Sequence, residues 1–160
     1  MHRIERDAAV YDLDNAAHDF PWTAVSKAGA PVEPRRAPKS NWFAGIPRGW
    51  GAVIHEYLTQ LDALVQRNHW SIHIAQVKEK FGTLRFYVDI LDEEGFACHE
   101  DSPGDVRQFF KLVREMESAT AEVCFDCGTR ENVECYGGWI HYACPACEKK
   151  LEDARGSRQS

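Results

Sequence analysis

Two C-x2-C pairs, Cys124-Phe-Asp-Cys127 and Cys144-Pro-Ala-Cys147, decide how the C-terminal end of this chain folds, and sixteen residues lie between them. That spacing is typical of a zinc site with four thiolate ligands. Zinc prefers a tetrahedron of sulfur atoms at about 2.3 Å, and a C-x2-C turn brings two of them to one ion. Gly128 gives the first turn the backbone freedom that it needs. The sequence therefore predicts that these four cysteines bind a structural Zn²⁺ ion.

Other uses of the cysteines fit the sequence less well. Disulfides are typical of exported proteins, and the polar start of the chain shows no export signal. A thioredoxin-like redox pair would account for only one of the two C-x2-C pairs. Cys135 and His141 lie between the pairs and are alternative ligands, but their spacing is poorer, and Cys98 is expected to be a free thiol. Four thiolates leave zinc no open position, so the ion is expected to stabilise structure and not to activate water.

Composition indicates a soluble globular protein in a reducing cytoplasm. The chain has 160 residues, of which 44% are hydrophobic and 28% are charged. No apolar run approaches the roughly 20 residues that span a bilayer, so no membrane partner is expected. The net charge is −6, and residues 92–119 hold three basic and eight acidic side chains. No long basic stretch is present, which argues against a duplex-DNA-binding protein.

Four regions follow from the distribution of residue types. Residues 1–40 are expected to form an extended arm or linker, because Pro31 to Pro38 contains three prolines. Within this arm, Phe20-Pro-Trp22 is expected to insert an aromatic side chain into a groove, and Trp22 is a candidate partner-binding residue. Residues 41–121 are expected to form an α+β domain, residues 122–152 a zinc ribbon, and residues 153–160 a disordered tail.

The α+β domain is predicted to have the order helix, strand, strand, helix. Apolar residues recur at helical spacing over 51–66. Residues 72–77 and 84–90 alternate as strands do, and the link 78–83 contains Gly82, which favours an antiparallel hairpin. An acidic loop is expected over 92–101. A second helix is expected over 103–121, with Ser102 as its cap, Pro103 at its first position and Asp105 reaching back.

Residues 133–142 resemble a small hairpin that turns at Gly137-Gly138, between the two cysteine pairs. The predicted fold class is therefore α+β, with a β-hairpin packed against two helices and a C-terminal four-cysteine zinc ribbon.

A basic and aromatic cluster is the second candidate site, and its members are Lys78, Lys80, Phe81, Arg85 and Tyr87. Cations beside aromatic rings are suited to single-stranded nucleic acid, where stacking contributes about 1–3 kcal/mol per base. The same residue types also dominate protein interfaces, so an acidic protein partner fits equally. The third interpretation is a solvated hairpin tip whose lysines pair with nearby acids. The residues alone leave all three open.

Catalytic patterns are poor. The chain has no P-loop, no nucleophile elbow and no H-E-x-x-H motif. Acidic residues of the loop offer a weak case for a metal-assisted hydrolase. These are Asp92, Glu93, Glu94, Glu100 and Asp101. A solvated loop explains them better, and the protein is not expected to be an enzyme.

Three motifs together resemble an uncharacterised family of small zinc-ribbon proteins found in bacteriophages, prophages and bacterial genomes. They are Gly49-Trp50 at the start of a helix, the string Gln76-Val-Lys-Glu-Lys-Phe-Gly-Thr-Leu-Arg-Phe-Tyr87, and the two C-x2-C pairs that enclose Gly137-Gly138-Trp139. The resemblance covers about residues 47–147. The Pro-rich N-terminal arm and the acidic insertion at 92–105 depart from it.

The resemblance implies an accessory role of phage type. The sequence and the resemblance together lead us to expect a non-catalytic, zinc-stabilised binding protein in the host cytoplasm. It is expected to engage or inhibit a host protein complex, such as a host-defence or nucleic-acid-processing complex. A single-stranded nucleic-acid-binding protein that uses Lys78, Lys80 and Arg85 is the alternative.

Overall fold

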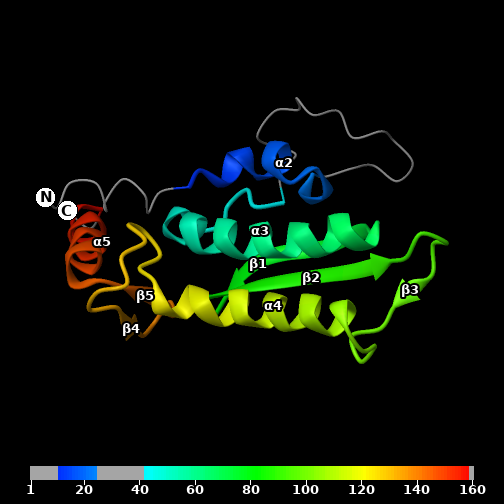
Figure 1. Ribbon diagram of the computed structural model, residues 1–160. Helices are drawn as coiled ribbons and strands as arrows, with labels where there is room; N and C mark the ends of the chain where they lie inside the picture. The colour runs from blue at the N-terminus through cyan, green and yellow to red at the C-terminus, as the bar shows by residue number, and fades with distance from the viewer. Residues whose placement is uncertain (1–10, 25–41, 159–160) are drawn as a thin grey trace, which may run out of the picture.

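Two long helices and a β-hairpin form the body of the protein, and a cysteine-bearing ribbon adjoins one end of it (Figure 1). The computed structural model describes residues 11–24 and 42–158. The body consists of α3 (Gly51–Asn68), β1 (Ser71–Lys80), β2 (Thr83–Leu91), β3 (Ala97–Cys98) and α4 (Asp105–Ala119). The ribbon follows with β4 (Glu134–Tyr136), β5 (His141–Ala143) and α5 (Pro145–Ser157). The predicted fold class, α+β with a hairpin on two helices and a C-terminal cysteine ribbon, is confirmed.

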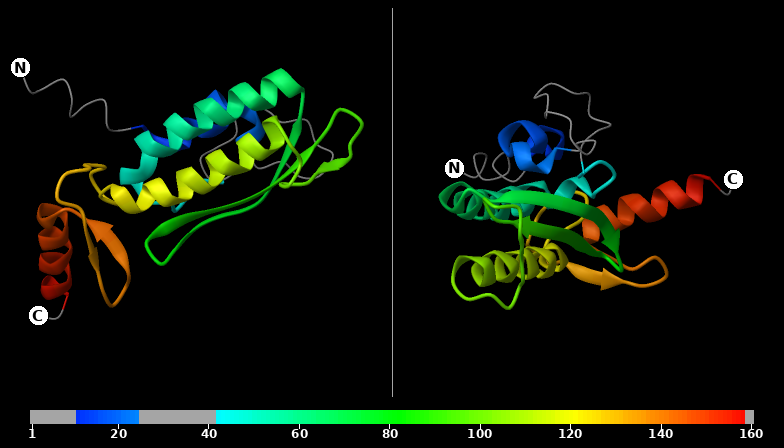
Figure 2. Two further views of the ribbon diagram at one scale, coloured as in Figure 1. Left: turned by 60° about the horizontal axis from the view of Figure 1, so that its bottom comes forward. Right: turned by 90° about the vertical axis from the view of Figure 1, so that its right-hand side faces the viewer.

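Helices α3 and α4 pack side by side on one face of the β1–β2 hairpin (Figure 2). Apolar side chains of the two helices and of the hairpin supply the buried core between them. Its most buried members include Ile54, Leu58, Leu61, Leu84, Ile90, Phe109 and Met116. Both helices are close to their predicted bounds, but α4 begins differently from the prediction. Its N-cap is Gly104, and the carboxylate of Asp105 accepts hydrogen bonds from Arg67 and Asn68 of α3. Asp105 therefore joins the two helices and does not cap its own.

The β1–β2 hairpin is longer and its turn tighter than the sequence predicted. The strands continue to Lys80 and resume at Thr83, so the turn consists of Phe81 and Gly82 alone. Both residues have positive φ, 53° and 79°, as a type I′ turn requires. The register shifts between Ile74 and Gln76, which is a β-bulge.

The bulge decides which side chains of β1 face the core. Ile74 pairs with Val88, and beyond the shift Val77 pairs with Phe86. Without the extra residue, simple alternation would place Lys78 on the same face as Ile74. The bulge instead turns Val77 inward and Lys78 outward.

The edge of β2 that faces α4 is closed by side chains of the helical segment. The N–H of Leu84 donates to the hydroxyl of Thr120, and the N–H of Phe86 donates to the carboxylate of Glu117. Thr120 begins the short 3₁₀-helix η5 (Thr120–Glu122) that follows α4. At its other end β2 pairs with β3, a strand inside the predicted acidic loop that sequence patterns missed.

The described part of the N-terminal segment belongs to the body and is not an extended arm. It forms the short helices η1 (Leu13–Asn15), α2 (Ala16–Asp19) and η2 (Pro21–Thr23), which pack on α3 (Figure 1). Leu13, Ala16 and Phe20 are buried there. The predicted Pro-rich linker, residues 31–38, lies outside the described residues. The predicted tail also differs, because α5 continues through Ser157.

Candidate metal centre

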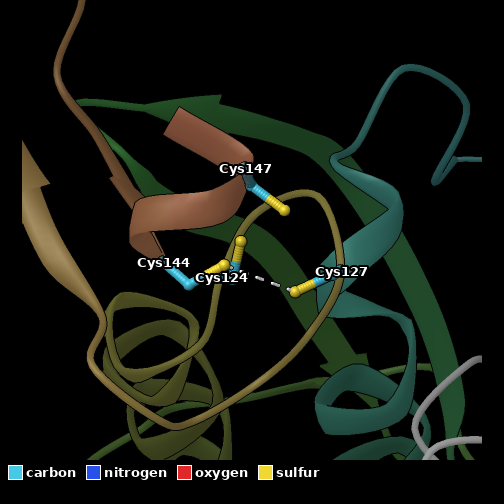
Figure 3. Close-up of side chains that lie close together, drawn as sticks. All are labelled: Cys124, Cys127, Cys144 and Cys147. Carbon is cyan, nitrogen blue, oxygen red and sulfur yellow. Dashed lines mark hydrogen bonds between the residues drawn. The ribbon is translucent and has the colours of Figure 1, made fainter. Parts of the chain in front are cut away.

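The four cysteines of the two C-x2-C pairs converge on one point (Figure 3). Their sulfur atoms all lie within 4.8 Å of one another, and those of Cys127 and Cys144 are 3.8 Å apart. Four sulfurs at about 2.3 Å from a tetrahedral zinc ion would be about 3.8 Å from each other. The donor set and its geometry therefore fit a zinc ion. Within the described residues, no other group of histidines, cysteines and acids is placed to hold a metal.

The first pair lies in a loop that backbone hydrogen bonds fold into a knuckle. The N–H of Gly128 donates to the carbonyl of Cys124, and the N–H of Cys124 donates to the carbonyl of Thr129. Gly128 has φ of 76°, a left-handed conformation that uses the backbone freedom of glycine. The second pair lies at the start of α5, where Cys144 is the N-cap and Cys147 lies in the first turn.

The thiols differ in how easily they lose a proton. Burial by itself raises the pKa of Cys124, but backbone hydrogen bonds from Cys127, Cys144 and Asp126 lower it to about 7. Burial raises the pKa of Cys127 and, more strongly, that of Cys147. One thiolate is therefore favoured by the fold, and a bound cation would favour the others, because a metal ligates the deprotonated sulfur.

Arg48 joins the knuckle to the body. Its Nε donates to Asp126, at 2.9 Å from the carboxylate and 3.2 Å from the carbonyl oxygen. The hydrogen bond to Asp126 raises the pKa of Arg48, and the nearby thiols of Cys147 and Cys127 contribute in the same direction. Four thiolates around Zn²⁺ would carry a formal charge of about −2. The guanidinium is thus placed to offset part of that charge.

Gly49 and Gly82 let the ribbon approach the body closely. The N–H of Gly49 donates to the carbonyl of Phe125 at 2.8 Å, and a Cβ at Gly49 would lie 2.2 Å from the carbonyl oxygen of Cys124. A Cβ at Gly82, in the hairpin turn, would lie 2.9 Å from the ring of Tyr142 in β5. Only glycine fits at the first contact, because the clash there is with backbone. The ribbon therefore docks at two points, the short 3₁₀-helix η4 (Arg48–Trp50) that precedes α3 and the hairpin turn.

A buried acid–imidazole pair supports the second cysteine pair. His141 is 2% exposed, and its Nδ1 lies 2.7 Å from the carbonyl oxygen of Trp139. Its Nε2 lies 2.5 Å from the carboxylate of Glu148, which follows Cys147. Nδ1 faces a carbonyl and therefore donates to it, and Nε2 forms a hydrogen bond with the carboxylate of Glu148. This contact ties β5 to the N-terminal end of α5, where Cys144 and Cys147 lie.

The other candidate ligands lie outside the sulfur cluster. The Nε2 of His141 is hydrogen-bonded to Glu148. Cys135 is an exposed residue of β4 and pairs with Tyr142 of β5. Cys98 is half-buried in β3, where burial raises its pKa. The group of converging sulfur atoms thus consists of Cys124, Cys127, Cys144 and Cys147, and includes none of these three residues. The sequence did not predict the pairing of His141 with Glu148. The only local signals for it were that Glu148 directly follows Cys147 and that His141 lies in a predicted strand.

The acidic loop does not form a second metal site among the described residues. The carboxylate of Asp92 accepts the N–H groups of Glu94 and Phe96 and so shapes the turn before β3. Glu100 lies 3.9 Å from the guanidinium of Arg114, and both side chains are well exposed. Asp92 thus stabilises a turn and Glu100 forms a surface ion pair, and the two carboxylates are not placed around a common metal position.

The candidate partner-binding residues divide into two groups. Lys78, Lys80, Arg85 and Tyr87 lie on the two strands of the hairpin and Phe81 lies at its turn. Trp22 lies apart from them, in η2, where its Nε1–H donates to the carboxylate of Asp62 in α3. Its indole is half-buried and packs against the core. The structure therefore gives Trp22 a partner within the chain.

No family model, curated protein or solved structure gives a significant match to this chain. None of the helices in the described ranges is both long and apolar enough to cross a membrane.

Proposed function

We propose that this chain is a non-catalytic binding protein whose ribbon is held against the body by a structural zinc ion. Support comes first from the ligand set, because four thiolates leave zinc no position for a substrate or a reactive water. In a segment as small as residues 122–152, a bound zinc ion contributes on the order of 10 kcal/mol to folding. The role proposed for the ion is therefore structural: it keeps the ribbon folded so that ribbon and body together present a binding surface.

The observation that carries the proposal is an apolar groove along the seam between body and ribbon. It has a volume of about 260 Å³, and body and ribbon both line it. The body contributes Gly45, Pro47, Arg48 and Glu79, and the ribbon contributes Phe125, Asp126 and Trp139. The groove depends on the docked ribbon, since neither part lines it alone.

Trp139 gives this groove the character of a protein-binding site. Its side chain is 46% exposed, although it stacks on His141 with ring centroids 4.7 Å apart and contacts Phe125 edge-on at 5.6 Å. A tryptophan held rigidly at the rim of an apolar groove is the residue type that contributes most at protein interfaces. We therefore propose a protein as the partner in this groove. The resemblance to small phage and prophage proteins supports a host protein complex as that partner.

A photo-crosslinking amino acid in place of Trp139 tests this proposal, with the same substitution at Phe96 as the matched control. Phe96 is 66% exposed and directly precedes β3 in the chain. Strand β3 lies at the end of the body opposite the ribbon (Figure 1). Tagged protein is irradiated in a bacterial lysate, and adducts are identified by mass spectrometry. We expect one stoichiometric protein adduct from position 139 that is missing from position 96. Equal adduct patterns at both positions across several hosts would refute a partner in the groove.

A further inference from the structure

The outer face of the β1–β2 hairpin is a second surface, separate from the groove. The bulge after Ile74 turns Gln76, Lys78 and Lys80 away from the core. Cross-strand pairing places Tyr87 opposite Gln76, and Arg85 opposite Lys78, on that same face. Helices α3 and α4 cover the other face of the hairpin (Figure 2). These side chains therefore form one surface that faces away from both helices.

This outer face is positively charged in a chain whose net charge is −6. From Gln76 to Tyr87 it carries three cationic side chains, Lys78, Lys80 and Arg85, and no carboxylate. Glu79 lies on the opposite face, where its carboxylate accepts the N–H of Gly82.

The three cations have no acidic partner within the described part of the chain. None of them forms an ion pair with a described carboxylate. The guanidinium of Arg85 instead donates to the hydroxyl of Thr83 at 2.7 Å and to the carbonyl of Leu84. The cations are therefore available to an external anion.

Two exposed aromatic rings accompany these cations. Tyr87 is 47% exposed, and the Nζ of Lys78 lies 5.7 Å from the centre of its ring. Phe81 is 64% exposed, and the Nζ of Lys80 lies 5.3 Å from the centre of its ring. The fold gains little burial from Phe81, which occupies a left-handed position that asparagine or glycine adopts more easily. A lysine beside an exposed ring thus occurs twice along the hairpin.

We propose that the outer face of the β1–β2 hairpin binds single-stranded nucleic acid. Phosphates pair with Lys78, Lys80 and Arg85, and bases stack on Tyr87 and Phe81. A single strand offers both a regular line of negative charge and unstacked bases, whereas a duplex keeps its bases stacked inside. An acidic peptide matches the cations but offers no flat rings in register with the two aromatic side chains. This activity goes beyond the protein-binding groove and does not depend on Trp139.

Fluorescence anisotropy with a labelled oligothymidylate of about 12 nucleotides tests the proposal, since such sites cover roughly 4–16 nucleotides. The zinc-loaded full chain is titrated into the probe at low salt, and the titration is repeated as salt increases. Three phosphate contacts predict a slope of about −2 in a plot of log affinity against log salt. A labelled polyglutamate peptide serves as the competing polyanion.

Variants separate this surface from general electrostatic attraction. The double variant Lys78→Ala/Lys80→Ala is expected to bind at least tenfold more weakly and to lower the salt slope by about 1.4. The matched control is Lys149→Ala/Lys150→Ala, which removes the same charge from the exposed side of α5 and is expected to leave affinity within about twofold.

Ring variants test the stacking. Tyr87→Ala is expected to weaken binding roughly tenfold to a hundredfold, and Tyr87→Phe to restore most of it. Phe81→Asn removes a ring but suits the turn, so binding should fall while the fold stays intact. Trp139→Ala should leave oligonucleotide affinity unchanged, which separates this test from that of the groove.

Three results would overturn the proposal. One is an unshifted probe at micromolar protein in low salt. Another is an equal loss of affinity in both double-lysine variants. The third is polyglutamate binding as tight as that of the oligonucleotide, which would assign the face to an acidic protein.

Discussion

Replacing Gly49 with alanine should separate the ribbon from the body without removing any of the four clustered cysteines. The added Cβ would lie 2.2 Å from the carbonyl oxygen of Cys124 and 2.6 Å from the carbonyl carbon of Phe125. Non-bonded heavy atoms are most stable at about 3.5–4.0 Å, so the knuckle must move by about 1 Å or more. Backbone atoms cannot swing aside as a flexible side chain would.

The cost of this displacement follows from two contributions. Overpacking of a tight contact typically costs about 1–3 kcal/mol. The hydrogen bond from the N–H of Gly49 to the carbonyl of Phe125, now 2.8 Å long, would be lost or stretched. Such a bond contributes about 0.5–1.5 kcal/mol. Together we expect the free energy of unfolding to fall by about 2–4 kcal/mol.

Urea unfolding and metal analysis distinguish undocking from loss of the metal. Gly49→Ala should keep one zinc per chain, because Cys124 and the other three ligands are unchanged, and yet unfold at lower urea. The control is Gly137→Ala, whose Cβ would have no other atom within 4 Å and whose φ is not positive. It should change stability by less than about 0.5 kcal/mol. If Gly49→Ala were as stable as the control, the described docking of the ribbon would be wrong.

Three further substitutions have definite expected outcomes. Cys147→Ser should purify without stoichiometric zinc and with an unfolded ribbon, whereas Cys135→Ser should retain zinc, as measured by metal analysis; equal zinc content in both would contradict the ligand set. Glu148→Ala leaves the Nε2 of buried His141 without its partner, so thermal unfolding should show a loss of about 1–3 kcal/mol, and unchanged stability would refute the buried pair. Phe81→Asn should raise stability by about 0.5–1 kcal/mol in urea unfolding, because asparagine tolerates the left-handed conformation, and a destabilised variant would argue against the type I′ turn.

The sequence predicted the elements whose signals are local. Helix α3 was predicted over 51–66 and extends over Gly51–Asn68, because the apolar spacing of its buried side is a property of consecutive residues. The ribbon hairpin was predicted to turn at Gly137-Gly138, and β4 and β5 flank those residues. The spacing of the cysteine pairs predicted the cluster for the same reason, since a C-x2-C turn holds two ligands together whatever surrounds it.

Contacts between distant segments were not predictable in this way. The bulge between Ile74 and Gln76 depends on how β1 meets β2 and the helices below it. Residues 11–24 were predicted as part of an arm, but Phe20 is buried against α3. No pattern among neighbouring residues indicates this contact. In the N-terminal part of α4, Asp105 was assigned a local capping role, and the proximity of Arg67 and Asn68 gave it a different one.

The sequence by itself therefore determined that four thiols can meet and which stretches form helices and strands, because ligand spacing and apolar periodicity act over a few residues. Only the tertiary structure decided where the ribbon sits and which face of the hairpin carries Lys78. Those outcomes depend on close backbone approach at Gly49 and Gly82 and on the register of β1. Both are set by packing between segments that lie far apart in the chain, and packing leaves little trace in the order of neighbouring residues.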